Sequence, residues 1–521
     1  MYTSESDDKV PASHRPEPGG GIFQHAQEVA LIQQVKTPVS NRKILSNTAI
    51  LSGYYAVEAA LLFALVVLFA RYLAVSDFGR LSFVLSYALL LVVADPSINI
   101  VLIKLISQNP DELAYWAGQG ISLRLITGAI IFTAGLAPFL FSDYFQSNAL
   151  LFIPIILSEQ VRGVSLTYCA IFRGMQAMIL EPVVLGVERL LVLSLVTVVL
   201  VHHAGIAWIG AVYAGGRIAS VAVAAILFRS QFARIALSLP EQWKRILGEA
   251  GPLGVLTISE RVNMNLIPTL LTLIRGEYLV GIFQSAFKIA MLPITVCGVL
   301  SGSLFPAMSA AVADRERLEK LFFYGLRLVW HVLLPFAAIT LVLSKNTIGA
   351  LFGARYLAAA PILRVLAVYY LCASLVIFGY YLMVALSRPR FVIQLAIINI
   401  VITIGLGIPL MYAFGPMGAA VALGVSYVVV AIGYWREVTR KGFEIFRHRR
   451  EWIQGLAFIV TMLAGAVLAH VWAIGTWSAF VVAGSTLWMI YFCVLASCGG
   501  LLPAEIHMIR ETVARVTGSR S

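Results

Sequence analysis

Long apolar runs are the feature that most limits what this chain can fold into. A membrane-spanning helix needs about 20 mostly apolar residues, and fourteen runs of that length alternate with charged or turn-forming stretches. They lie at 45–70, 81–103, 118–140, 148–171, 177–201, 205–228, 250–274, 279–304, 321–343, 358–385, 391–413, 415–434, 453–473 and 477–500. Because hydrocarbon offers no partners for backbone polar groups, these runs must be helical. We therefore predict an all-α polytopic membrane protein with about 14 transmembrane helices.

The composition excludes a soluble enzyme. Hydrophobic residues make up 60% of the 521 residues and charged residues 12%, which is unlike a soluble globular chain. No polar stretch reaches the roughly 50 residues of a small soluble domain. The sequence also shows no nucleotide-binding loop, metal-ligand spacing or nucleophile constellation. We therefore expect no catalytic residues, no metal and no cofactor.

The net charge of +12 is distributed unevenly between alternate loops. One set of loops is basic, including the linker 229–249 and the loop 436–452. The other set holds only Arg71, Arg80, Arg275, Lys345 and Arg355. Cytoplasmic loops carry the excess of Lys and Arg, and an even number of spans places both termini on one side. We therefore expect both termini in the cytoplasm, and we do not expect nucleic-acid binding.

A weak internal repeat divides the chain into two halves. Residues of the second and sixth spans match residues of the eighth and twelfth: Gly79 with Gly281, Ser82 with Gln284, Ser86 with Lys288, Gly210 with Gly418, and Gly216 with Gly424. Two parallel six-helix halves, related by an axis along the membrane normal, would enclose a central cavity. Chance similarity between Gly- and Ala-rich helices is the alternative.

The predicted domain organisation follows from this repeat. We expect a disordered cytoplasmic tail (1–43), an N-terminal lobe of six spans (44–228), a cytoplasmic linker (229–249), a C-terminal lobe of six spans (250–435), a basic cytoplasmic loop (436–452), two further spans (453–500) and a cytoplasmic C-terminal tail (501–521).

Charged residues inside the spans are candidates for function, because each costs about 2.5–3.5 kcal/mol at the bilayer centre on insertion scales. Five lie near the middle of their spans: Arg162, Arg189, Arg217, Arg261 and Lys288. They would suit a water-filled cavity for an anionic headgroup, since the arginine fork matches phosphate. The alternative is pairing with an acid, as Glu159 could pair with Arg162 on one helix face. Three arginines nearer to span ends are expected to reach the headgroup layer: Arg124, Arg327 and Arg364.

Polar side chains near these cations recur at helical spacing. The stripes comprise Thr48, Ser52, Tyr55 and Glu58 in the first span, Thr257, Arg261 and Asn265 in the seventh, and Gln284 and Lys288 in the eighth. A polar stripe faces lipid only at high cost, so these helices should line one shared polar space. Tyr55, Asn265 and Gln284 therefore join the substrate-binding candidates. Glu58 and Asp95 are candidates for ion coupling or for structural pairing.

Several short motifs carry a family resemblance. They are Ala70 to Gly79 with the following span ending at Ala94-Asp95, Phe172-Arg173-Gly174, Ala385 with Arg388-Pro389, and Gly415 to Ala420. The chain resembles the bacterial polysaccharide transporter, or oligosaccharide flippase, family, whose superfamily also holds multidrug extrusion proteins and lipid II flippases. One departure is Pro96-Ser97, where that family usually has a Leu-Gly pair.

The resemblance implies a flippase of the bacterial inner membrane. It would move undecaprenyl-diphosphate-linked oligosaccharides to the periplasmic leaflet by alternating access, for exopolysaccharide, capsule or O-antigen synthesis. Arg261 and Lys288 would then contact the diphosphate or acidic sugars. Membrane lipids, a polysaccharide polymerase and the chain-length machinery would be its partners.

Three alternatives stay open. A lipid II flippase would share the fold and the basic cavity. A multidrug exporter for organic cations should have a net acidic pocket instead. The third alternative belongs to a different functional class: a polytopic membrane enzyme acting on lipid-linked sugars. Such an enzyme would need a sizeable outer loop or a catalytic cluster.

Overall fold

The computed structural model describes residues 41–92, 95–232, 241–443, 449–471 and 477–501. These residues form helices and connecting turns, and no strand occurs among them. The predicted tails fall almost entirely outside this part of the chain, although residues 41–43 already belong to the first helix. The all-α prediction is confirmed.

The helices of the first half are α2 (Asn41–Tyr72), α3 (Val75–Leu91), α4 (Asp95–Gln108), α5 (Leu113–Gly135), α6 (Asp143–Ser147), α7 (Ala149–Gly174), α8 (Leu180–Val201) and α9 (Ala207–Gln231). Those of the second half are α10 (Trp243–Arg275), α11 (Glu277–Ala310), α12 (Arg315–Val342), α13 (Ser344–Phe352), α14 (Ala360–Ala385), α15 (Pro389–Phe414) and α16 (Pro416–Arg440). Two further helices follow, α17 (Arg449–Val471) and α18 (Trp477–Ser497). We call α2–α9 the N-lobe and α10–α16 the C-lobe.

Twelve helices in the described residues are long and apolar enough to cross a membrane, so the chain is a multi-pass membrane protein. Each of the fourteen predicted spans overlaps helical residues, but those at 81–103 and 250–274 are not among the twelve. The prediction of one continuous span at 81–103 was wrong. Helix α3 ends at Leu91 and α4 begins at Asp95, because Pro96 has no backbone N–H to bond the carbonyl of Val92, and its ring would clash with that carbonyl in a continuous helix.

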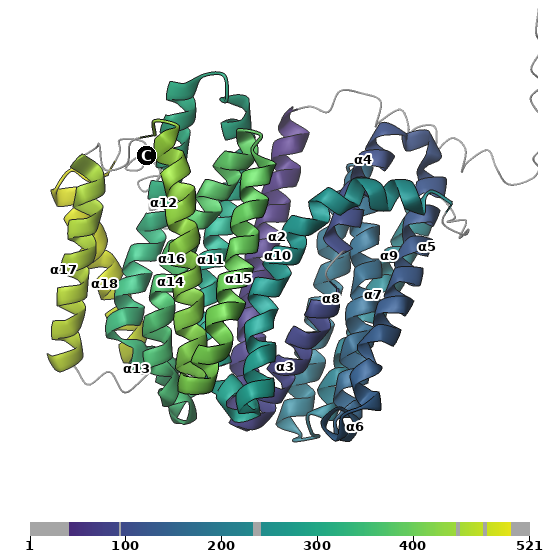
Figure 1. Ribbon diagram of the computed structural model, residues 1–521, viewed down its shortest axis with the longest axis horizontal. Helices are drawn as coiled ribbons and strands as arrows, with labels where there is room; N and C mark the ends of the chain where they lie inside the picture. Colours follow the sequence, from purple (N-terminus) through teal and green to yellow (C-terminus); the bar gives the residue numbers. More distant parts are fainter. Residues whose placement is uncertain (1–40, 93–94, 233–240, 444–448, 472–476, 502–521) are drawn as a thin grey trace, which may run out of the picture.

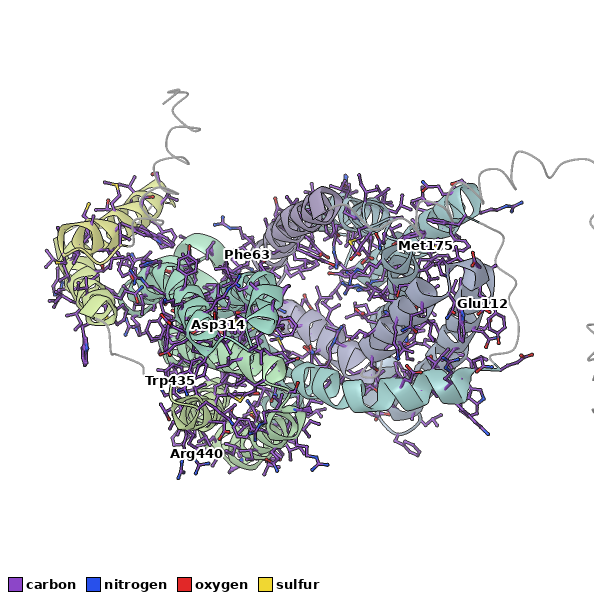
Figure 2. The ribbon with its side chains drawn as sticks, turned by 90° about the horizontal axis from the view of Figure 1, so that it is seen from above. Phe63, Glu112, Met175, Asp314, Trp435 and Arg440 are labelled. Atoms are coloured by element: carbon purple, nitrogen blue, oxygen red, sulfur yellow. The ribbon has the colours of Figure 1, made fainter. Side chains whose placement is uncertain are left out.

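The two lobes stand side by side (Figure 1). Within them, α7 packs on α9, and α16 packs on α14 and α15. Between them, α3 packs against α11 and α10. Seen from above, the teal α10 bridges the two lobes (Figure 2), and it contacts α4 on one side and α15 on the other. Helices α17 and α18 lie at the edge of the C-lobe against α12.

The lobes meet closely where α3 crosses α11. A Cβ atom added to Gly79 would lie 1.9 Å from the carbonyl oxygen of Glu277, and one added to Gly281 would lie 2.2 Å from that of Val75. Only glycine allows the two backbones to approach this far. The two glycines are the pair matched by the sequence repeat. We call this contact the glycine crossing.

An ion pair reinforces the glycine crossing. Arg80 donates from Nε to Glu277 Oε1 at 2.7 Å and from Nη2 to Glu277 Oε2 at 3.0 Å. The Tyr144 hydroxyl in α6, outside the spans, also donates to Glu277. Burial, followed by this hydrogen bond, raises the pKa of Tyr144, so the hydroxyl stays protonated and remains a donor. The lobes are therefore joined at the end of the molecule where α3 begins.

Candidate functional site

A cavity of about 610 Å³ lies between the lobes. Helices α2, α3 and α7–α9 of the N-lobe and α10 and α11 of the C-lobe contribute its lining. The polar lining residues are Tyr55, Glu58, Ser82, Ser86, Glu159, Arg162, Arg189, Tyr213, Arg217, Asn265, Gln284, Lys288 and Thr295. We call this cavity the main chamber. Its end nearest the glycine crossing is lined by Phe69 and Phe78.

A second cavity of about 320 Å³ is lined by parts of α4, α7 and α10. Its charged lining residues are Glu159, Arg162, Arg173 and Arg261. We call it the side chamber. Glu159 and Arg162 line both cavities, so the two chambers adjoin at this turn of α7.

The structure places the eight predicted substrate-binding residues around these chambers. Arg261 lines the side chamber, Arg162 lines both chambers, and the main chamber has Tyr55, Arg189, Arg217, Asn265, Gln284 and Lys288. Glu58 also lines the main chamber. The side chains of Asp95, Thr48, Ser52 and Thr257 lie outside the described residues. Residues up to about 230 positions apart in the sequence therefore share one polar space.

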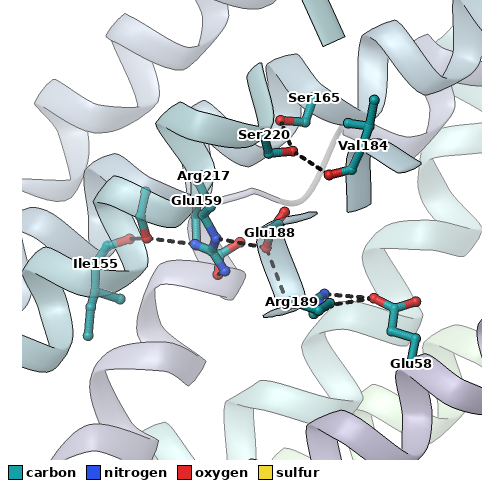
Figure 3. A network of polar contacts seen from close by, with 10 residues as sticks. Glu58, Ile155, Glu159, Ser165, Val184, Glu188, Arg189, Arg217 and Ser220 are labelled. Carbon is teal, nitrogen blue, oxygen red and sulfur yellow. Dashed lines mark hydrogen bonds and ion pairs between the residues drawn. The ribbon is translucent and has the colours of Figure 1, made fainter. Parts of the chain in front are cut away.

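The N-lobe wall of the main chamber holds a buried charge cluster (Figure 3). Arg217 Nη2 lies 2.7 Å from Glu159 Oε1, with 2% and 4% of the two side chains exposed. Arg189 Nη2 lies 2.8 Å from Glu58 Oε1. Glu188 Oε1 approaches both arginines, at 3.3 Å from Arg189 Nη1 and 3.5 Å from Arg217 Nε. Two arginines thus meet three carboxylates, which offsets the cost of burying their charges.

The pairing of Arg217 with Glu159 settles one open alternative. The sequence allowed Glu159 to pair with Arg162 three residues later, but its carboxylate binds an arginine from another helix instead. Arg217 Nη1 also donates to the Ser158 hydroxyl at 2.6 Å. Arg189 and Arg217 are therefore held by protein groups.

A second network ties α2 to the ends of α7 and α8. Arg173 Nε donates to Glu181 Oε2 at 2.6 Å, and its Nη2 donates to the Tyr55 hydroxyl at 2.6 Å. That hydroxyl in turn donates to Glu181 Oε1 at 2.6 Å. Sequence reasoning did not assign Arg173 or Glu181 to the site. The motif Phe172-Arg173-Gly174 was the available signal, but its meaning depended on which helix lies opposite.

Three cations of the chambers are not held in this way. The charged groups of Arg162, Arg261 and Lys288 have neither an ion pair nor a hydrogen bond with any part of the chain that the structure describes. Each side chain is partly exposed and lines a chamber. We call them the ligand-facing cations. A positive charge in a confined cavity attracts an anionic ligand.

The observed position of Arg124 contradicts another prediction. It was expected to reach the headgroup layer, but it is 2% exposed. Its guanidinium lies against α7, where a Cβ atom added to Gly163 would be 1.7 Å from Nη2. The missing side chain of Gly163 provides the space, which the position of Arg124 in its own helix does not reveal.

Comparison with known proteins identifies the family of this chain. A family model described as "Polysaccharide biosynthesis protein" matches residues 44–312, more than half of the chain. The chain belongs to this family. The resemblance found in the sequence is thereby confirmed, and the match covers both walls of the main chamber up to α11.

Two curated relatives are similar over shorter stretches. A probable low-salt glycan biosynthesis flippase, Agl15 of Haloferax volcanii, is 26% identical over 153 residues, or 29% of this chain and 32% of the relative. An uncharacterized membrane protein in the cps region of Klebsiella pneumoniae is 25% identical over 113 residues, or 22% of this chain and 23% of the relative. The chain thus spans a third or less of the length of these relatives.

Solved structures share the fold. The lipid II flippase MurJ in its inward closed conformation superposes with a TM-score of 0.65 at 14% identity, covering 85% of this chain and 98% of that one. An inward-facing multidrug resistance MATE family transporter gives 0.55 at 18% identity, covering 80% and 97%. Both are named as transport proteins. At these identities the likeness shows the fold alone.

Proposed function

We propose that the protein is a flippase that moves polyprenyl-diphosphate-linked oligosaccharides across the bacterial inner membrane. The observation that supports this proposal is the polar space between the two lobes. Its two chambers are lined by the ligand-facing cations Arg162, Arg261 and Lys288. Moving a sugar through hydrocarbon would cost roughly 2–7 kcal/mol for each unpaired hydroxyl, and a diphosphate would cost far more. A polar, basic cavity lowers this cost while the polyprenyl tail stays in lipid.

The charge of the chambers supports an anionic substrate over an organic cation. Acids near the chambers are engaged by arginines: Glu58 by Arg189, Glu159 by Arg217, and Glu181 by Arg173. A cationic drug would meet the ligand-facing cations and be repelled. We therefore favour the polysaccharide flippase over the multidrug exporter, and the family match points the same way.

The remaining parts of the proposal concern orientation and pathway. We propose that both termini lie in the cytoplasm, that the lobes comprise residues 44–228 and 250–435, and that the lobes alternate between inward- and outward-facing states. The product serves exopolysaccharide, capsule or O-antigen synthesis, in which a polymerase and the chain-length machinery act next. Because Glu58 pairs with Arg189, we assign it a structural role, and we leave Asp95 as the candidate for ion coupling.

The first test is the double substitution Arg261→Ala/Lys288→Ala in the full-length protein. We expect surface polysaccharide to be lost at an unchanged protein level, with lipid-linked repeat units trapped on the cytoplasmic leaflet. The matched control is Arg317→Ala/Lys320→Ala, which removes two cations that are exposed at the start of α12. Normal polymer from the Arg261/Lys288 variant would contradict the assignment of these residues.

Chromosomal deletion separates the alternatives. Trapped, untranslocated repeat units would support the flippase. Rescue of peptidoglycan synthesis in a strain lacking its own flippase would point to lipid II, and altered drug tolerance with normal polymer would point to an exporter. Translocated but unpolymerised units would identify a membrane enzyme.

A further inference from the structure

We propose that the two chambers divide the substrate between them, and that the saccharide is acidic. In this proposal, which rests on the proposed function, Arg162 and Arg261 of the side chamber hold the diphosphate. The main chamber receives the saccharide, and Lys288 recognises a carboxylate on it. Lys288 and Gln284 would then be specificity-determining residues.

The two chambers offer different chemistry. In the side chamber the guanidinium groups left for a ligand are those of Arg162 and Arg261, because Arg173 is held by Glu181. A guanidinium presents paired donors in a fixed fork, which matches two oxygens of a phosphate. In the main chamber, hydroxyl and amide groups come from Ser82, Ser86, Tyr213, Asn265 and Gln284. Hydroxyls and amides both donate and accept, as sugar hydroxyls require. The main chamber is also about twice as large as the side chamber.

Gln284 points to a ligand that carries a hydrogen-bond donor. Its side chain is 2% exposed and lines the main chamber. Its Oε1 has no hydrogen-bond partner within the described chain. A buried amide oxygen left in this state costs about 1–3 kcal/mol. A hydroxyl of a bound saccharide would supply the missing donor.

Lys288 lies one helical turn beyond Gln284 on α11 and lines the same chamber. Two other cations of the chamber wall, Arg189 and Arg217, are held by carboxylates, and Arg162 stands where the side chamber begins. Among the described residues, Lys288 is thus the cation within the main chamber that is left for a ligand. Its ammonium group is a compact point charge that can bind a carboxylate or a phosphate. Because Arg162 and Arg261 hold the diphosphate in the side chamber, we assign Lys288 to a carboxylate on the saccharide in the main chamber.

The positions of the main chamber and the side chamber set the direction in which the substrate binds. Ser82 and Ser86 on α3 join Gln284 and Lys288 on α11 in the main chamber, and α3 and α11 are the helices that form the glycine crossing. The side-chamber residues of α7 run from Glu159 to Arg173, toward the end of that helix at Gly174. Helix α7 begins beside α6, at the joined end. The saccharide would therefore lead toward the crossing, and the diphosphate would follow nearer the opposite end.

The test measures binding of three probes to the purified full-length protein in nanodiscs by calorimetry. The probes are undecaprenyl diphosphate, undecaprenyl-diphosphate-linked glucose and undecaprenyl-diphosphate-linked glucuronic acid. For the unchanged protein we expect the glucuronic acid probe to bind about tenfold more tightly than the glucose probe, which corresponds to 1.4 kcal/mol. Lys288→Met should abolish this preference without weakening the binding of undecaprenyl diphosphate.

Three further variants separate the roles. Lys288→Arg keeps the charge and should keep the preference. Gln284→Leu should weaken both sugar-linked probes but not undecaprenyl diphosphate. Arg261→Gln should weaken all three probes by a similar factor. Size-exclusion profiles in detergent and thermal unfolding verify that each variant is folded.

Two results would overturn the proposal while leaving the flippase function in place. One is equal binding of the glucose and glucuronic acid probes by the unchanged protein. The other is a loss of undecaprenyl diphosphate binding in Lys288→Met as large as that in Arg261→Gln. Failure of the unchanged protein to bind any of the three probes would instead contradict the proposed function itself.

Discussion

The two walls of the main chamber treat their cations differently. On the N-lobe wall, Arg189 and Arg217 are buried and held by carboxylates of the buried charge cluster. On the C-lobe side, Arg261 and Lys288 reach the chambers without an ion-pair partner among the residues described. Apart from Arg162 on α7, the N-lobe wall therefore uses its arginines to join its own helices, whereas the C-lobe side leaves its positive charge available. A cation inside a membrane protein can serve structure or ligand binding, and its partners decide which.

The largest effect on stability is expected from Glu159→Leu. This change leaves the Arg217 guanidinium buried without its closest carboxylate, and breaking a buried pair in this way costs about 3–5 kcal/mol. The folded yield in detergent and the unfolding temperature should both fall steeply. Glu249→Leu is the matched control, because it removes a carboxylate whose partners Lys104 and Arg245 are themselves more than half exposed. Equal unfolding temperatures for the two variants would show that the N-lobe pairs are not structural.

A smaller effect on stability is expected from a substitution at the glycine crossing, where the two lobes meet. Gly79→Ala places a methyl group against the backbone of Glu277, and overpacking of this kind costs about 1–3 kcal/mol. It should also loosen the glycine crossing. A Ser82→Cys reporter should then react faster with a membrane-impermeant maleimide added from outside the cell. Gly186→Ala, with open space around its Cβ, should leave the labelling rate unchanged, and an unchanged rate for Gly79→Ala as well would contradict a closing role for the crossing.

Glu58→Gln should be tolerated better than Glu159→Leu. The amide keeps the shape of the side chain, and Arg189 retains its contact with Glu188. Two carboxylates would still face two arginines in the cluster, so we expect a loss of roughly 1–2 kcal/mol, as for a hydrogen bond to a charged group. The unfolding temperature should lie between those of the unchanged protein and Glu159→Leu. A loss as large as that of Glu159→Leu would show that all three carboxylates are required.

The smallest effect on stability is expected from Lys288→Met. Removing this ammonium leaves no carboxylate of the described chain without its partner, so the unfolding temperature should stay the same or rise slightly. Surface polysaccharide should nevertheless fall. A variant that unfolds readily would place Lys288 with the structural cations of the other wall, and the contrast between the walls would disappear.

Much of this organisation could be predicted from the sequence, because the bilayer imposes length and polarity on each segment separately. The apolar runs predicted the helices. The polar stripes predicted that residues of distant helices line one polar space. The repeat marked Gly79 and Gly281, although it did not show that they touch. The family motifs gave the family. The continuous span at 81–103 failed because Pro96 acts on backbone geometry, which hydropathy does not register.

The sequence by itself determined the all-α membrane fold and the set of polar residues that cannot face lipid. Only the tertiary structure decided which of those residues are partners. Arg217 binds Glu159, which lies 58 residues away, because α7 packs on α9. Arg124 is buried because Gly163 on another helix leaves it space. Hydropathy is a property of one segment, but an ion pair depends on the distance between two side chains, and that distance is fixed only when the helices pack.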